Sequence, residues 1–261
     1  FYYKILFIVI QIIQPKFLSA RSVVNIISLS AANLPIALGI AGTIILTGTD
    51  LSAGRVVGLV GCVSASLLQM SGYANKMFPS LATFPVFAAL IIAMLIGALV
   101  GVINGFCTAK FKLHPFIVTL STQLIVYGIL LMYLMIGSNN GQSISGLDNS
   151  YTDFITGSFI AFGKTPIPNY VWYSILITLL MWFMWNKTTF GKNMFAVGSN
   201  SEAANVSGVN VDRTIILVFL LAGIMYGLTG FIEAARIGSN SAATGLNYEL
   251  DAILAVALGG N

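Results

Sequence analysis

PVFAALIIAMLIGALVGVINGFCTA, residues 85–109, is a continuous apolar run without a charged side chain. The hydrocarbon core of a bilayer is about 30 Å thick, and a helix needs about 20 apolar residues to cross it. The run is therefore long enough for a membrane-spanning helix. Gly97, Gly101 and Gly105 are four residues apart and share one stripe of that helix. Small residues let helix backbones approach in lipid, so the stripe predicts close packing, either static or sliding.

The same pattern recurs along the chain. Further charge-free apolar runs occupy residues 23–46, 56–70, 114–136, 169–186 and 214–232, with partial runs at 5–13 and 252–258. We therefore predict an all-α membrane protein, a polytopic transmembrane helix bundle with about seven spans plus the start of another. The bundle would form one domain over residues 1–261. The chain begins at Phe1 and ends at Asn261 in an apolar run, so we expect it to be truncated at both ends.

The composition excludes several classes of protein. The 261 residues are 57% hydrophobic and only 8% charged, whereas about 25% is typical of a soluble domain. An ordinary cytosolic enzyme and a disordered chain are both excluded. The net charge of +4 comes from scattered residues, and no basic cluster is present to bind nucleic acid.

The residues that usually carry catalysis or bind metals are few. His114 is the only histidine, and because it precedes Pro115 it more plausibly begins a helix than acts as a ligand or base. Cys62 and Cys107 lie in apolar runs without metal-ligand spacing. We therefore expect no catalytic residues, no metal site and no cofactor.

The positions of lysine and arginine give a weak orientation signal. Lys110 and Lys112 lie between two spans, and Lys187, Lys192 and Arg213 lie between two others. Short cytoplasmic loops are enriched in these residues. The pattern predicts that residues 110–113 and 187–213 are cytoplasmic and that the long loop 137–168 is external.

The segment TGTDLSAGR, residues 47–55, interrupts two apolar runs without room for a long loop. One interpretation is a glycine-bearing break at the membrane edge whose backbone lines a cavity. The other is a tight cytoplasmic turn in which Asp50 and Arg55 form a solvated pair. The sequence leaves both interpretations open.

Several other polar residues fall within or beside the spans. Glu233 and Arg236 are three apart, which allows a same-face ion pair at the outer interface or a contact with a hydroxyl-rich solute. Asn104 and Gln123 could line a path for such a solute or form interhelical hydrogen bonds. The candidate pathway residues are Asp50, Ser52, Asn104, Gln123, Glu233 and Arg236.

Residues 199–210, SNSEAANVSGVN, predict a short helix between spans. Ser199 and Glu202 have the spacing of a capping box, Ala203 and Ala204 favour a helix, and Gly208 fits its end. About two turns are too few for independent stability, so the helix needs a surface to dock on. That surface is either a groove in a cytoplasmic partner or the membrane surface.

Four stretches carry a resemblance to a known family: residues 49–55, 186–193, 198–209 and 249–253, the last reading ELDAI. The chain resembles the membrane subunit of bacterial ABC importers for ribose- and galactose-type sugars, most closely the galactose/methyl-galactoside branch. The resemblance runs over nearly the whole chain. Members of the family begin earlier and continue beyond the glycines at 259–260, which also implies a truncated chain.

The resemblance implies a transport subunit without catalytic chemistry, located in the bacterial inner membrane. Two permease copies would form a pathway that imports a monosaccharide by alternating access. A cytoplasmic ABC ATPase would drive it, and a periplasmic sugar-binding protein would deliver the sugar. The residues implied to contact the ATPase are Glu202, Ala203, Ala204 and Gly208.

Two other functions remain as alternatives. An ion-coupled secondary transporter or channel for a small polar solute would need ion or proton sites in the membrane, and the sequence offers few. A membrane-embedded enzyme would need converging acid, base or metal groups, which one histidine and scattered carboxylates supply poorly.

Overall fold

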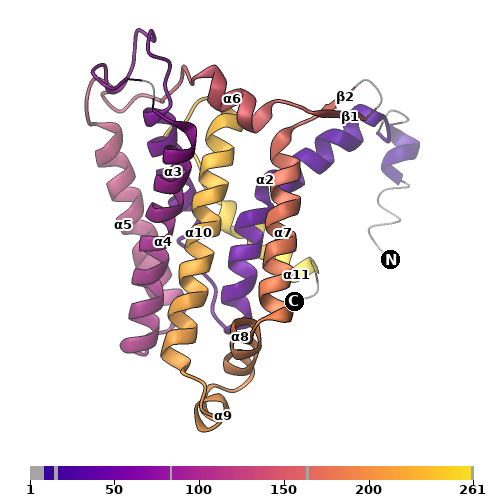
Figure 1. Cartoon of the computed structure of the whole chain (residues 1–261), viewed down its shortest axis with the longest axis vertical. Coiled ribbons are helices and arrows are strands. Elements are labelled where there is room, and N and C mark those ends of the chain that lie inside the picture. The colour runs from indigo at the N-terminus through magenta and orange to yellow at the C-terminus, as the bar shows by residue number, and fades with distance from the viewer. Residues whose placement is uncertain (1–8, 15–16, 83, 163–164, 260–261) are drawn as a thin grey trace.

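The computed structural model describes residues 9–14, 17–82, 84–162 and 165–259. Helices dominate this part of the chain, and one two-stranded antiparallel sheet joins them (Figure 1). The elements are α2 (Ala20–Ile45), α3 (Ala53–Leu67), α4 (Val86–Lys110), α5 (Pro115–Leu134), α6 (Asn149–Thr156), β1 (Ile160–Phe162), β2 (Thr165–Ile167), α7 (Asn169–Lys187), α8 (Thr189–Ser199), α9 (Ser201–Val206), α10 (Val211–Ile237) and α11 (Tyr248–Gly259).

Helix α10 is the centre of the bundle and packs against α2, α3 and α4. Its contact with α4 is made by backbone, as the glycine spacing predicts. A methyl group added at Gly97 would lie 2.0 Å from the carbonyl oxygen of Gly223, and one at Gly101 would lie 2.1 Å from that of Phe219. No larger side chain fits between the two helices at these positions.

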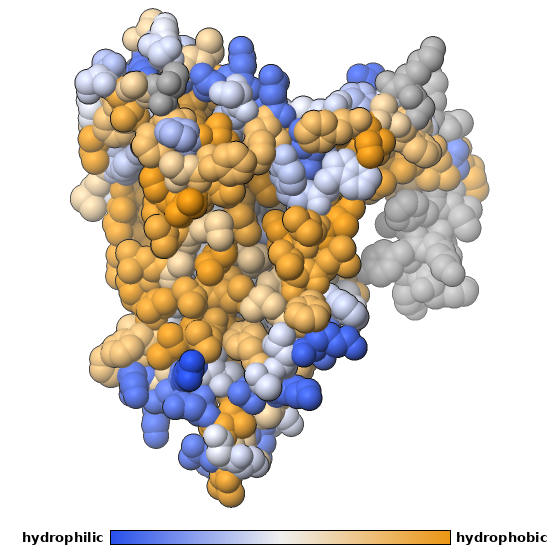
Figure 2. Space-filling view, viewed as in Figure 1, coloured by the Kyte–Doolittle hydropathy of each residue, from blue (hydrophilic) through white to orange (hydrophobic). Residues whose placement is uncertain are grey.

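The opposite face of α4 is built differently. Ile91, Leu95 and Leu99 lie one helical turn apart and are 58%, 62% and 62% exposed. Figure 2 shows such apolar side chains forming a broad band between two more hydrophilic ends. An apolar band of this kind is favourable in a bilayer and unfavourable in water, so α4 presents small residues to the bundle and large ones to lipid.

Four helices are long and apolar enough to cross a membrane among the described residues: α2, α4, α5 and α10. Helix α3 is apolar but has only 15 residues. Helix α7 has 19 residues, but its many tryptophan, tyrosine and asparagine residues lower its hydropathy. The helical, membrane-spanning character is confirmed, whereas the count of about seven spans is not. Residues 5–8 of the expected first span lie outside the described residues.

The two ends of the bundle differ. The α4–α5 loop, α8 and α9 lie at one end, and α6 with the β1–β2 hairpin lies at the other (Figure 1). The described residues of loop 137–168 include a helix and two paired strands. Asp148 caps α6 by accepting a hydrogen bond from Ser150 N, and Ile160 pairs with Ile167 in the hairpin. His114 caps α5 and Pro115 is its first residue, so the predicted helix entry is confirmed.

Candidate functional site

Residues 46–52, between α2 and α3, form a non-helical break that buries two polar side chains, Asp50 and Ser52. Asp50 and Ser52 both have 0% exposure. Asp50 Oδ1 accepts hydrogen bonds from Ser52 N at 2.9 Å and Ser52 Oγ at 2.6 Å, and Tyr226 Oη donates to Oδ2 at 3.2 Å. A buried carboxylate is costly unless it is hydrogen-bonded, and these three donors supply that stabilisation.

Two more helices hold the break in place. Asn104 of α4 donates from Nδ2 to Ser52 Oγ at 3.0 Å, and Thr122 of α5 donates to Asn104 Oδ1 at 2.6 Å. Thr119 Oγ1 accepts from Leu51 N at 3.1 Å. The break is therefore tied by side chains to α4, α5 and α10, as irregular backbone inside a membrane protein requires.

Arg55 does not pair with Asp50. Its Nη1 donates to Ala242 O at 3.1 Å, and its guanidinium lies 4.1 Å from the centroid of the Tyr127 ring. Of the two interpretations of residues 47–55, the turn with a solvated Asp50–Arg55 pair is wrong, because the break turns inward and packs Asp50 among helices while Arg55 points to the loop before α11. Sequence spacing alone could not distinguish these directions.

Gln123 meets an acidic residue of α11. Its Nε2 donates to Glu249 Oε1 at 3.3 Å, while Glu249 Oε2 is buried without a hydrogen-bond partner in the described structure. A methyl group added at Gly54 would lie 2.0 Å from that oxygen. Gln123 and Gly54 therefore hold the beginning of α11 against α3 and α5.

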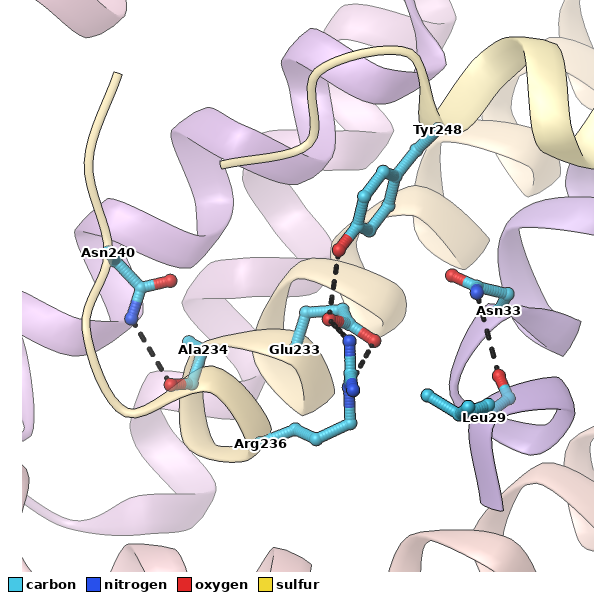
Figure 3. Close-up of polar contacts among 7 residues, drawn as sticks. All are labelled: Leu29, Asn33, Glu233, Ala234, Arg236, Asn240 and Tyr248. Atoms are coloured by element: carbon cyan, nitrogen blue, oxygen red, sulfur yellow. Dashed lines mark hydrogen bonds and ion pairs between the residues drawn. The ribbon is translucent and has the colours of Figure 1, made fainter. Parts of the chain in front are cut away.

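Glu233 and Arg236 form the expected ion pair near the end of α10. Arg236 donates from Nε to Glu233 Oε1 at 2.8 Å and from Nη2 to Oε2 at 2.7 Å. Tyr248 of α11 donates to Oε2 at 3.2 Å and points toward the pair (Figure 3). The Glu233 side chain is fully buried, whereas that of Arg236 is 25% exposed. Arg236 thus offers the accessible side of a bidentate pair.

The short helix between spans forms where the sequence places it, but with a different cap. Ser199 is the last residue of α8, and Asn200 Oδ1 instead accepts from Ala203 N at 2.9 Å. The capping prediction for Ser199 is wrong because α8 extends further than its composition indicates. Gly208 has φ of +85°, a left-handed conformation that glycine adopts without strain.

The α9 side chains divide into two groups. Glu202 and Ala203 are exposed, whereas Ala204 is 4% exposed and faces the bundle. Val206 was missed by the sequence analysis, and at 90% exposure it is the most exposed large apolar residue of the described structure. A single valine among small and polar residues gave no periodic signal. Val206 lies with Glu202 and Ala203 on the exposed side of α9.

A cavity of about 430 Å³ lies beside α9, and its lining includes Lys112, Glu202 and Asp212. Lys110 forms a 3.0 Å ion pair with Asp212, which joins the α4–α5 loop to the beginning of α10. Surface ion pairs contribute little stability, so this contact mainly sets the relative position of the two segments.

Comparison with known families gives one match over most of the chain. The family described as "Branched-chain amino acid transport system / permease component" matches residues 22–261. No solved structure matches the chain significantly.

Individual relatives match at higher similarity. The chain is 45% identical over 262 residues to the galactose/methyl galactoside import permease protein MglC of Escherichia coli (strain K12), covering 99% of this chain and 77% of the relative. It is 41% identical to the MglC protein of Haemophilus influenzae over the same shares. It is 31% identical to the ribose import permease protein RbsC of Escherichia coli (strain K12), over 98% of this chain and 74% of that relative.

Proposed function

The chain belongs to the branched-chain amino acid transport system / permease component family, and from this premise we propose that it is the membrane subunit of an ABC importer for galactose or methyl galactoside. The observation that carries the proposal is 41–45% identity to galactose/methyl galactoside import permeases over 99% of the chain. Identity to ribose permeases is lower. The chain is a transport subunit rather than an enzyme and a multi-pass inner-membrane protein.

The span count follows from the order of the elements. Helices α2, α4, α5 and α10 are joined by α3, which with the buried break reaches across the bundle, and by α7. Residues 5–13 would supply a seventh span and α11 the beginning of another. In the proposed topology the spans alternate in direction, with loop 137–168 outside and residues 187–213 in the cytoplasm.

The two soluble partners dock at opposite ends of the helix bundle. The cytoplasmic ATPase contacts α9 through Glu202, Ala203 and Val206, since these side chains are exposed there. Ala204 and Gly208 support that surface rather than form it, because Ala204 is buried and Gly208 ends the helix. A periplasmic sugar-binding protein docks at the end with α6 and the hairpin. A second permease copy completes the pathway within the lipid bilayer.

The candidate pathway residues fall into two groups, one with buried side chains and one with an accessible side chain. Asp50, Ser52 and Asn104 have 0% exposure and position the break, while Gln123 holds Glu249. Arg236 is accessible and is positioned by Glu233, so this pair contacts the solute. During alternating access, α4 then moves against α10 along their glycine contact. Closure of the ATP-bound partner supplies the free energy that shifts the permease from one conformation to the other.

The test is radiolabelled galactose uptake into proteoliposomes that contain the full-length permease and its ATPase, with the binding protein outside and ATP inside. We expect uptake only when both partners and ATP are present. Uptake of ribose but not galactose would contradict the proposed sugar. Uptake without ATP or partners would favour the alternative, an ion-coupled secondary transporter or channel.

A further inference from the structure

A second polar cavity lies at the end of the bundle opposite α9, away from the break and the α9 surface. It has a volume of about 520 Å³ and lies between the first turns of α2, strand β2 and the beginning of α7. Pockets for small molecules usually measure about 300–1,000 Å³. We propose that this cavity is an entry site that binds a monosaccharide before translocation, an inference that rests on the proposed function.

Three polar side chains of α2 face the cavity. Arg21, Asn25 and Ser28 are spaced four and three residues apart and therefore share one face of the helix. Asn25 is exposed, whereas Ser28 is 7% exposed. Ser28 Oγ lies near the Tyr170 hydroxyl, which also lines the cavity, but forms no hydrogen bond of ordinary geometry in the described part of the chain. A ligand hydroxyl in the cavity would give this buried group a well-aligned partner.

The rest of the lining suits a sugar ring. Tyr170, Pro166 and Pro168 contribute flat or apolar surfaces, on which the C–H face of a pyranose can pack. Thr165 adds another hydroxyl from β2. Among the described residues of the lining, Arg21 alone is charged, and its guanidinium donates to neutral hydroxyls as well as to anions. Hydroxyl, amide and apolar surfaces together favour a neutral, hydroxyl-rich ligand over a phosphate.

The cavity also lies beside the ion pair of α10. Tyr170 contacts the cavity and lies within electrostatic range of both Glu233 and Arg236. Arg236 is the partly exposed member of that pair. Glu233 and Arg236 do not line the cavity, but Tyr170 lies between it and them. This proximity is consistent with a cavity at the entrance of the proposed pathway.

The experiment measures protection of an engineered cysteine by galactose. Asn25→Cys is introduced into the full-length permease, assembled with its ATPase in phosphatidylcholine nanodiscs without binding protein. The rate of modification by a small charged thiol reagent is measured with and without galactose. The control is Ser158→Cys, an exposed position at the same end but outside the cavity lining.

We expect galactose to slow modification of Cys at position 25 at least threefold and to leave the control unchanged. Adding Ser28→Ala should raise the galactose concentration for half-protection at least fivefold. A modification rate of the Asn25→Cys variant that galactose leaves unchanged would overturn the proposal. Galactose uptake by the unsubstituted permease, in proteoliposomes with its ATPase, internal ATP and external binding protein, separates the two hypotheses: uptake without protection of the Asn25→Cys variant rejects only the entry site, whereas absent uptake rejects the importer function.

Discussion

Asp50 is the one ionisable residue of the helix break, residues 46–52, and its carboxylate is hydrogen-bonded at both oxygens. Its three hydrogen bonds come from Ser52 and Tyr226, and the residue is completely buried. Its role in the structure is to hold non-helical backbone in one conformation between α2 and α3. Removing it leaves buried donors without partners, which is more costly than removing a donor and acceptor together.

We therefore predict that Asp50→Ala destabilises the purified permease–ATPase complex by about 1–3 kcal/mol for each donor left unpaired. Thermal unfolding in detergent measures the effect, and galactose uptake should fall with it. Tyr226→Phe removes one hydrogen bond to Oδ2 and should cost less. A complex with Asp50→Ala that melts at the wild-type temperature would contradict this role.

We expect a different effect at the Glu233–Arg236 pair, because the Glu233 side chain is buried and that of Arg236 is accessible. Arg236→Gln leaves the Glu233 carboxylate buried without its cation, and because Arg236 is partly exposed the cost should fall below the roughly 3–5 kcal/mol of breaking a fully buried pair. We expect galactose uptake to fall at least tenfold. Arg236→Lys keeps the charge but loses the bidentate geometry, so its uptake should be intermediate.

The double change Glu233→Gln with Arg236→Gln is the matched control for the pair, because it leaves no uncompensated charge. If it restores thermal stability but not uptake, Arg236 contacts the solute. Full uptake by the double variant would instead assign the pair a purely structural role.

At the scale of elements, the contact between α4 and α10 depends on the absence of side chains. We predict that Gly97→Val prevents the helices from packing, because its Cβ alone would lie 2.0 Å from Gly223 O. The complex should lose thermal stability and show reduced yield on size-exclusion chromatography. Gly128→Val in α5 is the matched control, since a Cβ there meets nothing within 4 Å. Equal stability of both variants would contradict the contact.

Helix α9 supplies the second prediction at this scale. Val206 is 90% exposed at its end, so Val206→Asp should leave the permease folded while weakening its contact with the ATPase. We expect less ATPase to copurify with the permease and at least a tenfold loss of uptake. Val206→Ile should retain both properties. Normal copurification and uptake with Val206→Asp would place the ATPase contact elsewhere.

Glu202→Arg tests the polar part of the exposed α9 surface. Gly208→Pro tests the turn that follows α9. Both should uncouple ATP-driven uptake. Gly208 has a positive φ that proline cannot adopt, so that variant also moves the beginning of the following segment. Comparing thermal stability of the two variants separates loss of contact from loss of local structure.

At the scale of the whole molecule, the two ends of the bundle must face different compartments. We predict that Cys introduced at Val206 is labelled by an impermeant maleimide only in inside-out vesicles, and Cys at Ser158 only in right-side-out vesicles. Cys62 is buried, and Cys107→Ala removes the other native thiol. Labelling of both positions from one side would contradict the alternating topology.

The class of the protein and much of its local structure can be predicted from the amino-acid sequence. A charged fraction of 8% and long apolar runs indicate a membrane protein, whatever the packing of its helices. The glycine stripe, the entry of α5 at Pro115 and the short helix at α9 followed from local spacing and helix-terminus chemistry. These features depend on residues near one another in the chain, so periodicity and propensity are sufficient to predict them.

The places where polar groups meet depend on the packing of helices that are distant in the chain. Asp50 and Tyr226 are 176 residues apart, and the direction of the break, the partner of Arg55 and the burial of Ala204 depend on such distant contacts. In a membrane, the face of a helix toward lipid and the face toward its neighbours are both apolar. The apolar pattern therefore reveals each helix but not which side packs, which neighbour it meets or which polar residue is enclosed.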